Sequence, residues 1–114
     1  MTILHSGDIL RIDFGLPVGS EAGLIHFAVV LTANEVLSRS PNTIQVVPVT
    51  SNTRRRRPGD VTVDALPVQS VAESDLITTV SLAARADALI HGNVGPVAVA
   101  QIRSVVADLL DLPA

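Results

Sequence analysis

The sequence predicts a small, mainly β domain in which a curled antiparallel sheet or barrel is covered by one C-terminal helix. The length of 114 residues suits a single domain over residues 1–114 with one modest core. Short apolar segments rich in β-branched residues recur up to residue 94, with Gly, Pro and Ser between them. The clearest helical apolar period comes only after this region. Many short strands followed by one packing helix are typical of such a fold.

The first third of the chain predicts two strands and a helical turn. Asp8–Phe14 partly alternates between apolar and polar residues, which indicates a strand with one face in water. Gly15–Gly23 is a loop long enough to be functional, and Leu24–Thr32 is apolar enough for a central strand buried on both faces. Ala33–Leu37 predicts a turn of helix with Asn34 as its cap.

The middle of the chain predicts a strand pair around a cationic loop. Thr43–Thr50 has strand character, and Pro48 within it favours an edge position or a bulge. Ser51–Gly59 is polar and rich in arginine, as in a hairpin loop. Asp60–Val63 alternates and predicts a short returning strand.

The following segments are short, and we expect each to form one small element. Ser70–Ala72 and Leu76–Leu82 predict two strands, or one strand broken near Asp75. Ala83–Leu89 predicts a helical turn, and His91–Val94 predicts a last short strand.

The C-terminal segment predicts an amphipathic helix. Gly95 and Pro96 suit the cap and the first position of a helix, and Pro113 comes near the end of the chain. Apolar residues then recur with helical spacing and predict the face that packs on the sheet: Ile102, Val105, Val106, Leu109 and Leu110.

Composition excludes several classes of chemistry. The chain has no cysteine, which excludes disulfides, thiolate zinc sites and thiol nucleophiles, and makes a cytoplasmic location the default expectation. All eight basic residues are arginine, so there is no lysine for a phosphate-binding Walker loop or a Schiff base. No apolar run approaches the ~18 residues of a membrane span, so we expect no membrane contact.

Charge is concentrated in one run. The formal net charge is −3, yet four arginines are consecutive at 54–57. Such a run can simply be a solvated loop, or it can hold several phosphates, because planar guanidinium donors match phosphate oxygens. With only two aromatic residues, both Phe, the chain cannot bind RNA by base stacking on an aromatic platform.

His26 is the candidate among the three histidines. It interrupts an apolar strand directly after the Gly15–Gly23 loop, whereas His5 and His91 lack any such context. Histidine ordinarily changes charge near neutral pH, so a side chain at the rim of a cleft would suit acid–base chemistry. A hydrogen-bonded core or edge histidine fits the sequence equally well. The histidines have no metal-ligand spacing, and we expect neither a metal site nor a cofactor.

A series of short motifs over residues 7–112 resembles the MazF/PemK toxin family. The motifs stand in order: Gly7-Asp8-Ile9, Asp13-Phe14, Gly19-Ser20-Glu21, Ala28-Val29-Val30-Leu31, Val47-Pro48-Val49-Thr50-Ser51, and the Leu-rich C-terminal helix. The resemblance implies an SH3-like small β-barrel of the CcdB/MazF type that works as a homodimer. It also implies a toxin of a type II toxin–antitoxin module that cleaves single-stranded RNA without a metal.

The resemblance also implies the chemistry and the partner. In this family the ribose 2′-hydroxyl attacks the adjacent phosphorus and leaves a 2′,3′-cyclic phosphate and a 5′-hydroxyl. A MazE-like antitoxin blocks the cleft with an acidic C-terminal segment. The family's catalytic threonine falls on Thr50, where it would hold a phosphate oxygen as charge grows there. Further RNA contacts are expected at Gly19, Ser20, Glu21, Ser51, Arg54, Arg55, Arg56, Arg57 and Asp75.

The sequence departs from the family at the catalytic arginine. The family's Arg-Pro pair before the apolar strand is replaced by His26 and Phe27, and its Asp-Gln-x-Arg run becomes Asp75-Leu76-Ile77-Thr78. Two hypotheses follow. Either His26 serves as general acid or base with Thr50, or the chain is a non-catalytic member that binds RNA, an antitoxin or another target.

Overall fold

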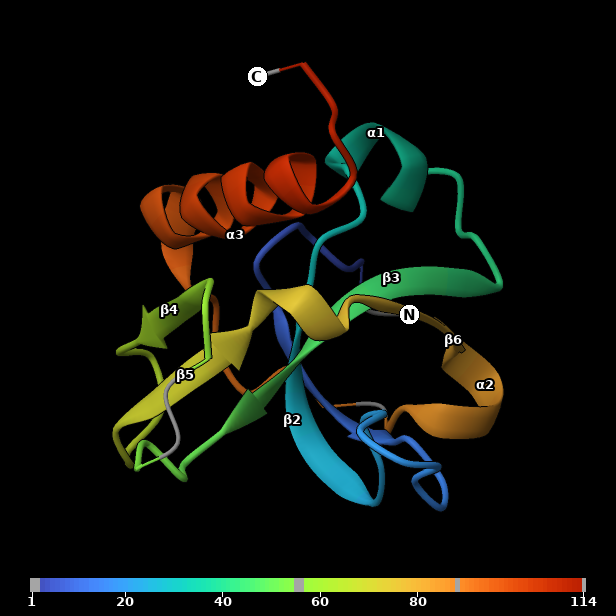
Figure 1. Cartoon of the computed structure of the whole chain (residues 1–114). Coiled ribbons are helices and arrows are strands. Elements are labelled where there is room, and N and C mark those ends of the chain that lie inside the picture. Colours follow the sequence, from blue (N-terminus) through green and yellow to red (C-terminus); the bar gives the residue numbers. More distant parts are fainter. Residues whose placement is uncertain (1–2, 55–56, 88, 114) are drawn as a thin grey trace.

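The computed structural model describes residues 3–54, 57–87 and 89–113, and within them the chain forms one antiparallel sheet with helices packed on it (Figure 1). The elements are: β1 (Ile9–Asp13), β2 (Ile25–Val30), α1 (Asn34–Leu37), β3 (Thr43–Thr50), β4 (Asp60–Val63), β5 (Ser70–Glu73), the 3₁₀ turn η1 (Ser74–Leu76), β6 (Thr78–Ser81), α2 (Leu82–Arg85) and α3 (Gly95–Leu109). The strand order is β1-β2-β3-β5-β4, and β6 pairs with the first half of β3. The mainly β fold with a C-terminal helix is confirmed, but the sheet curls without closing into a barrel.

Two apolar cores lie on opposite faces of β1, β2 and β3. Alternation along β2 directs Ala28 and Val30 into one core and Val29 into the other. The prediction of a central, doubly buried strand is therefore confirmed for this half of β2. At its start Ile25 is exposed and His26 is half-buried, so the strand emerges from the core toward solvent.

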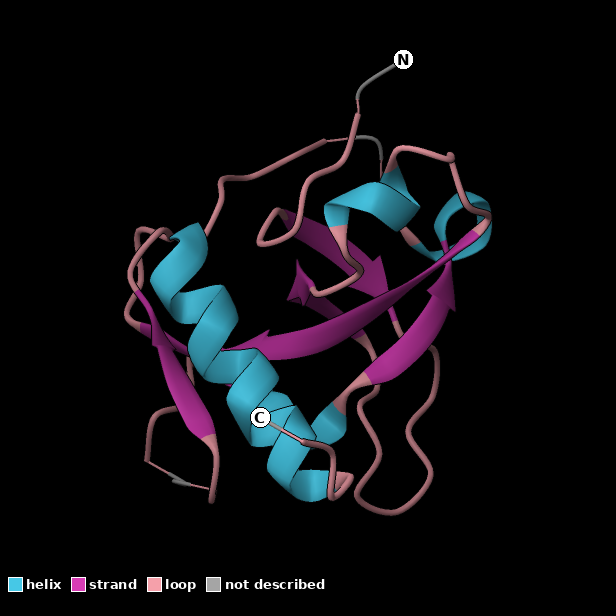
Figure 2. Cartoon of the chain, turned by 90° about the horizontal axis from the view of Figure 1, so that it is seen from above, coloured by secondary structure: helices cyan, strands magenta, loops and turns pink. Residues whose placement is uncertain are grey.

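Helix α3 packs on the core that also contains residues of β4 and β5. The view from above shows this long helix lying across the sheet (Figure 2). Ile102 is fully buried and anchors the helix on the sheet. The predicted apolar face was partly wrong, because Leu109 and Leu110 are exposed. Leu109 is the last residue of the helix and Leu110 is its C-cap, so periodicity alone overestimated the length that packs on the sheet.

Pro48 was predicted to lie at an edge or a bulge, and the edge position was wrong, because the residue lies in the centre of the sheet. It is buried and pairs with Ala28 of β2, while β3 pairs on its other side first with β6 and then with β5. The carbonyl of Gln45 accepts a hydrogen bond from Leu31 and so faces β2. Alternation then turns the nitrogen of Pro48 to the opposite side, between the residues that pair with β6 and those that pair with β5. The missing N–H of proline therefore removes no ladder bond.

Three smaller predictions were also wrong. The Ser51–Gly59 loop does not close a hairpin, because β5 lies between β3 and β4 in the sheet. The His91–Val94 segment forms only an isolated bridge from Asn93 to Asp8. Asn34 does not cap α1, since its side-chain oxygen accepts a hydrogen bond from the backbone N–H of Ser6.

The remaining elements follow the sequence closely. The two short strands expected around Asp75 are β5 and β6, and η1 separates them. Helix α2 is a single turn and ends before the predicted Leu89. Among the described residues, no helix combines the length and the apolar character needed to cross a membrane.

Candidate functional site

A cavity of about 590 Å³ opens where β2 and β3 diverge, and both His26 and Thr50 line it. The last pair on this side of the β2–β3 ladder is Ala28 with Pro48. Continuing this register by two residues would place His26 opposite Thr50, and both side chains leave the sheet on the same face. The strands separate before this pair forms, so the two side chains border an open space.

The Thr50 hydroxyl can donate a hydrogen bond to a ligand, because its contact with the backbone uses it only as an acceptor. Its Oγ1 accepts a hydrogen bond of 3.1 Å from the backbone N–H of Asn52, which orders the turn after β3. A hydroxyl that accepts one hydrogen bond still has its own hydrogen to donate. Thr50 is half-buried, so this hydrogen can reach a ligand in the cavity.

The ring of Phe27 helps to shape the cavity next to His26. It packs edge-on against the ring of His91, with ring centroids 5.0 Å apart and an angle of 65° between the planes. His91 is in turn 3.7 Å from the Asp87 carboxylate. The residue that replaces the proline expected from the family is thus fixed in place by an aromatic contact.

Arg11, Ser51 and Ser70 complete the polar lining of the cavity. Sequence analysis placed Ser51 among the site residues but missed Arg11. The available signal was strand alternation, because Arg11 points away from the buried Leu10 and Ile12. Arg11 pairs with Phe27 in the β1–β2 ladder, so it lines the cavity from the face of the sheet opposite to that of His26 and gives the cavity a positive charge.

Glu21 and Asp75 line a different cavity of about 560 Å³, together with Asp13 and Arg85. This space lies between the β1–β2 loop and the segment that runs from η1 into β6. Gly19 and Ser20 are exposed on the same loop. The predicted site residues therefore do not share one cavity, because Glu21 and Asp75 line this one and His26, Thr50 and Ser51 line the other.

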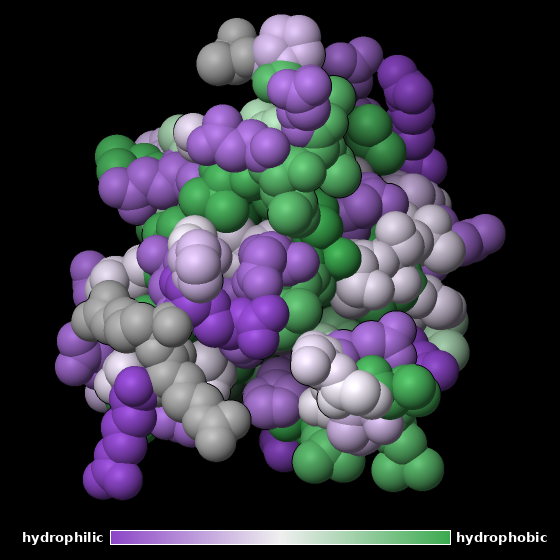
Figure 3. Space-filling view, viewed as in Figure 1, coloured by the Kyte–Doolittle hydropathy of each residue, from purple (hydrophilic) through white to green (hydrophobic). Residues whose placement is uncertain are grey.

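The arginine run is not a uniform cationic surface. Arg57 donates hydrogen bonds from Nε and Nη2 to one carboxylate oxygen of Asp75, at 3.2 and 2.6 Å. This contact raises the pKa of Arg57 further, so its charge is permanent. Arg54 is exposed, whereas Arg55 and Arg56 lie outside the described residues. On the face seen in Figure 3, hydrophilic side chains gather near the middle, and the region of α3 above them carries both apolar and hydrophilic side chains.

Glu73, at the end of β5, is an ionisable group that sequence analysis missed. Burial raises the pKa of its carboxyl above the usual value, and the positive charge of Arg57 opposes this rise. Asp60 and Asp75 add to the rise, while His26 opposes it. The only sequence signal was a glutamate directly after the apolar Val71–Ala72 pair, where the chain could equally have turned toward solvent.

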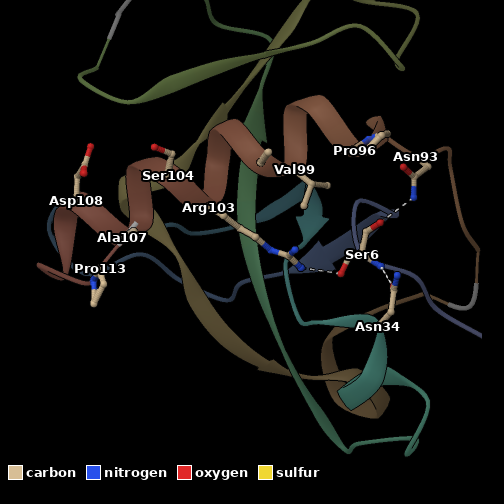
Figure 4. A pocket seen from close by; sticks show the side chains of 11 residues that line it. Ser6, Asn34, Asn93, Pro96, Val99, Arg103, Ser104, Ala107, Asp108 and Pro113 are labelled. Atoms are coloured by element: carbon tan, nitrogen blue, oxygen red, sulfur yellow. Dashed lines mark hydrogen bonds between the residues drawn. The ribbon is translucent and has the colours of Figure 1, made fainter.

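A further cavity of about 630 Å³ lies between α3 and α1 and contains none of the predicted site residues (Figure 4). Its polar groups mostly satisfy one another. Arg103 donates hydrogen bonds to the Ser6 hydroxyl and to the Leu31 carbonyl, and Ser6 also contacts Asn34 and Asn93. These contacts tie α3 to the N-terminal segment. Elsewhere in the described structure, no three His, Cys, Asp or Glu side chains are grouped as metal ligands.

The sequence matches a family profile over residues 5–110, and that family is described as the PemK-like, MazF-like toxins of type II toxin–antitoxin systems. The chain belongs to this family. No curated protein matches it at a significant level. As a family member it is a MazF-like toxin.

Solved structures of MazF proteins share the fold. The chain is similar to MazF of Deinococcus radiodurans, with a TM-score of 0.84 and 24% identity over 98% of this chain and all of that one. It is also similar to the MazE–MazF complex of the same organism, with a TM-score of 0.76 and 22% identity over 99% of this chain and all of that one. A mycobacterial endoribonuclease in complex with its cognate antitoxin aligns with a TM-score of 0.72 and 22% identity, over 100% of this chain and 99% of that one.

Proposed function

We propose that this MazF-like toxin is an endoribonuclease that cleaves single-stranded RNA, including mRNA, at short sequence motifs in the cytoplasm. The observation that carries the proposal is that His26 and Thr50, far apart in sequence, line one cavity with Arg11. Arg11 supplies positive charge for the phosphodiester, and the Thr50 hydroxyl donates to a non-bridging phosphate oxygen. Neither role needs a metal ion.

His26 carries the proton in the proposed reaction. The neutral imidazole takes the proton of the ribose 2′-hydroxyl as that oxygen bonds to phosphorus. The imidazolium then gives this proton to the 5′ oxygen as the phosphorus–oxygen bond to it breaks. The products are a 2′,3′-cyclic phosphate and a 5′-hydroxyl, with no net gain or loss of protons. General acid–base catalysis of this kind contributes roughly 10²–10⁴-fold to the rate.

RNA binding would extend beyond the cavity. We propose contacts from Ser51 next to Thr50, from the β1–β2 loop at Gly19, Ser20 and Glu21, and from Asp75. The arginine run would hold phosphates beside the groove. Exposed Arg54 is its best candidate, and Arg55 and Arg56 stay in the proposal on sequence grounds alone. Arg57 is already paired with Asp75 and would need to exchange that partner for phosphate.

The proposed assembly is a homodimer neutralised by a MazE-like antitoxin with an acidic C-terminal segment. Solved MazE–MazF complexes among the similar structures support an antitoxin partner. Arg54 on the exposed loop would attract such a segment electrostatically.

The test is cleavage of a sequence-diverse RNA by the purified chain in EDTA. We expect cyclic-phosphate ends, no reaction at a site with a 2′-deoxy sugar, and strong loss of cleavage in His26→Ala. His5→Ala is the matched control, because His5 is exposed near the N-terminus. Intact RNA that nevertheless binds would favour the alternative of a non-catalytic binding protein. Full activity of His26→Ala would exclude histidine chemistry.

A further inference from the structure

The polar cavity of about 560 Å³ adjoins the cavity of His26 and Thr50 and takes no part in the proposed proton transfers. The two cavities meet at the end of the β1–β2 ladder, where Asp13 pairs with Ile25. Asp13 lines the polar cavity, and Ile25 lines the cavity of His26 and Thr50. Residues opposite one another in an antiparallel pair have Cα atoms only about 4.5–5.5 Å apart. A nucleotide next to the cleaved bond is therefore within reach of the polar cavity.

Gly15 brings Arg85 of α2 and Asp13 of β1 to the same wall of this cavity. Oδ1 of Asp13 accepts a hydrogen bond of 2.8 Å from the backbone N–H of Gly15. A Cβ placed on Gly15 would lie 3.2 Å from Nη1 of Arg85, so the guanidinium rests against the glycine. The φ of Gly15 is +76°, a conformation that favours glycine as well. Both charged side chains are thus held around one residue.

The two charged groups do not neutralise each other. Within the part of the chain that the structure describes, Arg85 forms no ion pair with Asp13 or with any other acid. The guanidinium of Arg85 keeps N–H donors available, and the carboxylate of Asp13 keeps acceptor positions that Gly15 does not use. A ligand that bridges them needs acceptors on one edge and donors on the adjoining edge.

The charge of the lining disfavours a phosphate and favours a neutral ligand. The cavity is lined by three carboxylates and one arginine: Asp13, Glu21, Asp75 and Arg85. An anion would meet this excess of negative charge, whereas a base would not. Half-buried Phe14 adds an aromatic ring to the lining, against which the face of a base can pack.

Guanine is the RNA base whose edges match this arrangement. It carries the acceptors O6 and N7 side by side on one edge, and the donors N1–H and N2–H side by side on the adjoining edge. The planar fork of an arginine matches two neighbouring acceptors, and a carboxylate matches two neighbouring donors. We propose that the polar cavity binds a guanine base next to the cleavage position, with Arg85 on O6 and N7 and Asp13 on N1–H and N2–H. This inference rests on the proposed ribonuclease function, and it makes Arg85 and Asp13 specificity-determining residues.

Binding of an uncleavable RNA tests the base preference directly. The probe is a short oligouridine with one variable base and with 2′-fluoro riboses, which lack the attacking hydroxyl. Fluorescence anisotropy measures its affinity for the full chain. We expect guanine to bind roughly 5–150-fold more tightly than adenine, cytosine or uracil, which is the discrimination of a good bidentate contact. Equal affinities for the four bases overturn the inference.

Base analogues and variants assign the two edges. The analogue 7-deazaguanine lacks N7, so it should weaken binding to the wild type but not to Arg85→Ala. Inosine lacks the N2 amino group, so it should weaken binding to the wild type and to Arg85→Ala but not to Asp13→Asn. Arg39→Ala is the matched control, because Arg39 is exposed just after α1 and pairs with Glu35, and it should keep the full preference for guanine.

The same measurements contain the results that contradict the inference. If Arg85→Ala weakens every RNA equally, the arginine contacts only phosphate, and the guanine site is excluded. The analogue series on the wild-type chain needs no variant, so it still tests the inference if Arg85→Ala does not fold. Equal binding of guanine and both analogues overturns it.

Cleavage separates this inference from the proposed function. Sequencing of the cut ends of a sequence-diverse RNA should show guanine at one fixed position beside the cut with the wild type, but not with Arg85→Ala. If guanine is preferred in binding while RNA is never cut, the ribonuclease proposal fails and the guanine site stands. If RNA is cut without any preference for guanine, only the guanine site fails.

Discussion

The guanidinium of Arg57 lies 2.6 Å from the carboxylate of Asp75 and ties the β3–β4 loop to η1. The two side chains are 38% and 27% exposed, so water screens their attraction only in part. Asp60 holds the backbone of the same arginine through its N–H. One residue of the cationic run thus serves the fold, because it joins the end of the β3–β4 loop to η1.

Breaking this ion pair should cost modest stability. We expect Arg57→Ala and Asp75→Asn to show a coupling free energy of about 0.5–1 kcal/mol in a double-mutant cycle, as for partly exposed pairs. Urea unfolding measures it. Arg54→Ala is the matched control, because Arg54 is exposed, and it should change stability by less than about 0.5 kcal/mol. Strictly additive effects of the two substitutions would show that the pair contributes nothing.

Glu73 should make the chain less stable as the pH rises. Its pKa is raised in the folded chain, so the folded state binds the proton more tightly than the unfolded state. This contribution is complete below the ordinary carboxyl pKa and is lost as the pH rises through the raised value. Glu73→Gln should therefore increase stability at neutral pH by up to about 1 kcal/mol, given the partial exposure of the group. Thermal unfolding at several pH values measures the difference.

The gain in Glu73→Gln should disappear in acid, where the wild-type carboxyl is itself neutral. Glu35→Gln should show no comparable trend, since Glu35 is exposed on α1. A gain that is the same at all pH values would mean that ionisation of Glu73 is not its cause.

Thr50 should contribute to RNA cleavage through its hydroxyl. Thr50→Val keeps the shape of the side chain but removes the donor, and we expect the single-turnover rate to fall roughly 10²–10³-fold, as for loss of one oxyanion donor. Thr50→Ser retains the hydroxyl and should keep most of the rate. Binding of a 2′-deoxy RNA should weaken far less than the rate. Equal rates for the valine and serine variants would remove Thr50 from the mechanism.

Gly59 should be needed for the approach of the arginine loop to α3. It has a φ of +88°, and a Cβ there would lie 2.5 Å from a methyl carbon of Val105. Gly59→Ala should destabilise the fold by about 1–3 kcal/mol, through backbone strain and this contact. Gly19→Ala is the control for strain alone, because Gly19 also has a positive φ but open space around it. Equal losses in the two variants would mean that contact with Val105 costs nothing.

Much of the fold could be predicted from the sequence because local patterns determine it. The bounds of β3 and β4 were predicted residue for residue, whereas α3 begins at Gly95, which was expected to be its cap, and Val94 takes the cap position. Alternation and helical spacing report which face of an element is apolar. The family motifs also identified the toxin family, which the profile match confirms.

Pairing between distant segments could not be predicted, because it depends on contacts that no local pattern encodes. Pro48 suggested an edge position or a bulge, yet β3 is a central strand. It tolerates the proline because its partner changes from β6 to β5 at this point. The Ser51–Gly59 loop was predicted to close a hairpin, but β5 lies between β3 and β4, the two strands that this loop connects.

The sequence by itself determined which groups are available for chemistry: a histidine after a glycine-rich loop, a threonine after an apolar strand, and eight arginines without a lysine. Only the tertiary structure decided which of these groups meet. The divergence of β2 from β3 places His26 and Thr50 in one cavity. The turn η1 after β5 places Asp75 where Arg57 donates hydrogen bonds to it. The reason is that charge and hydrogen bonding act over a few ångströms of space, and the register of the sheet sets those distances.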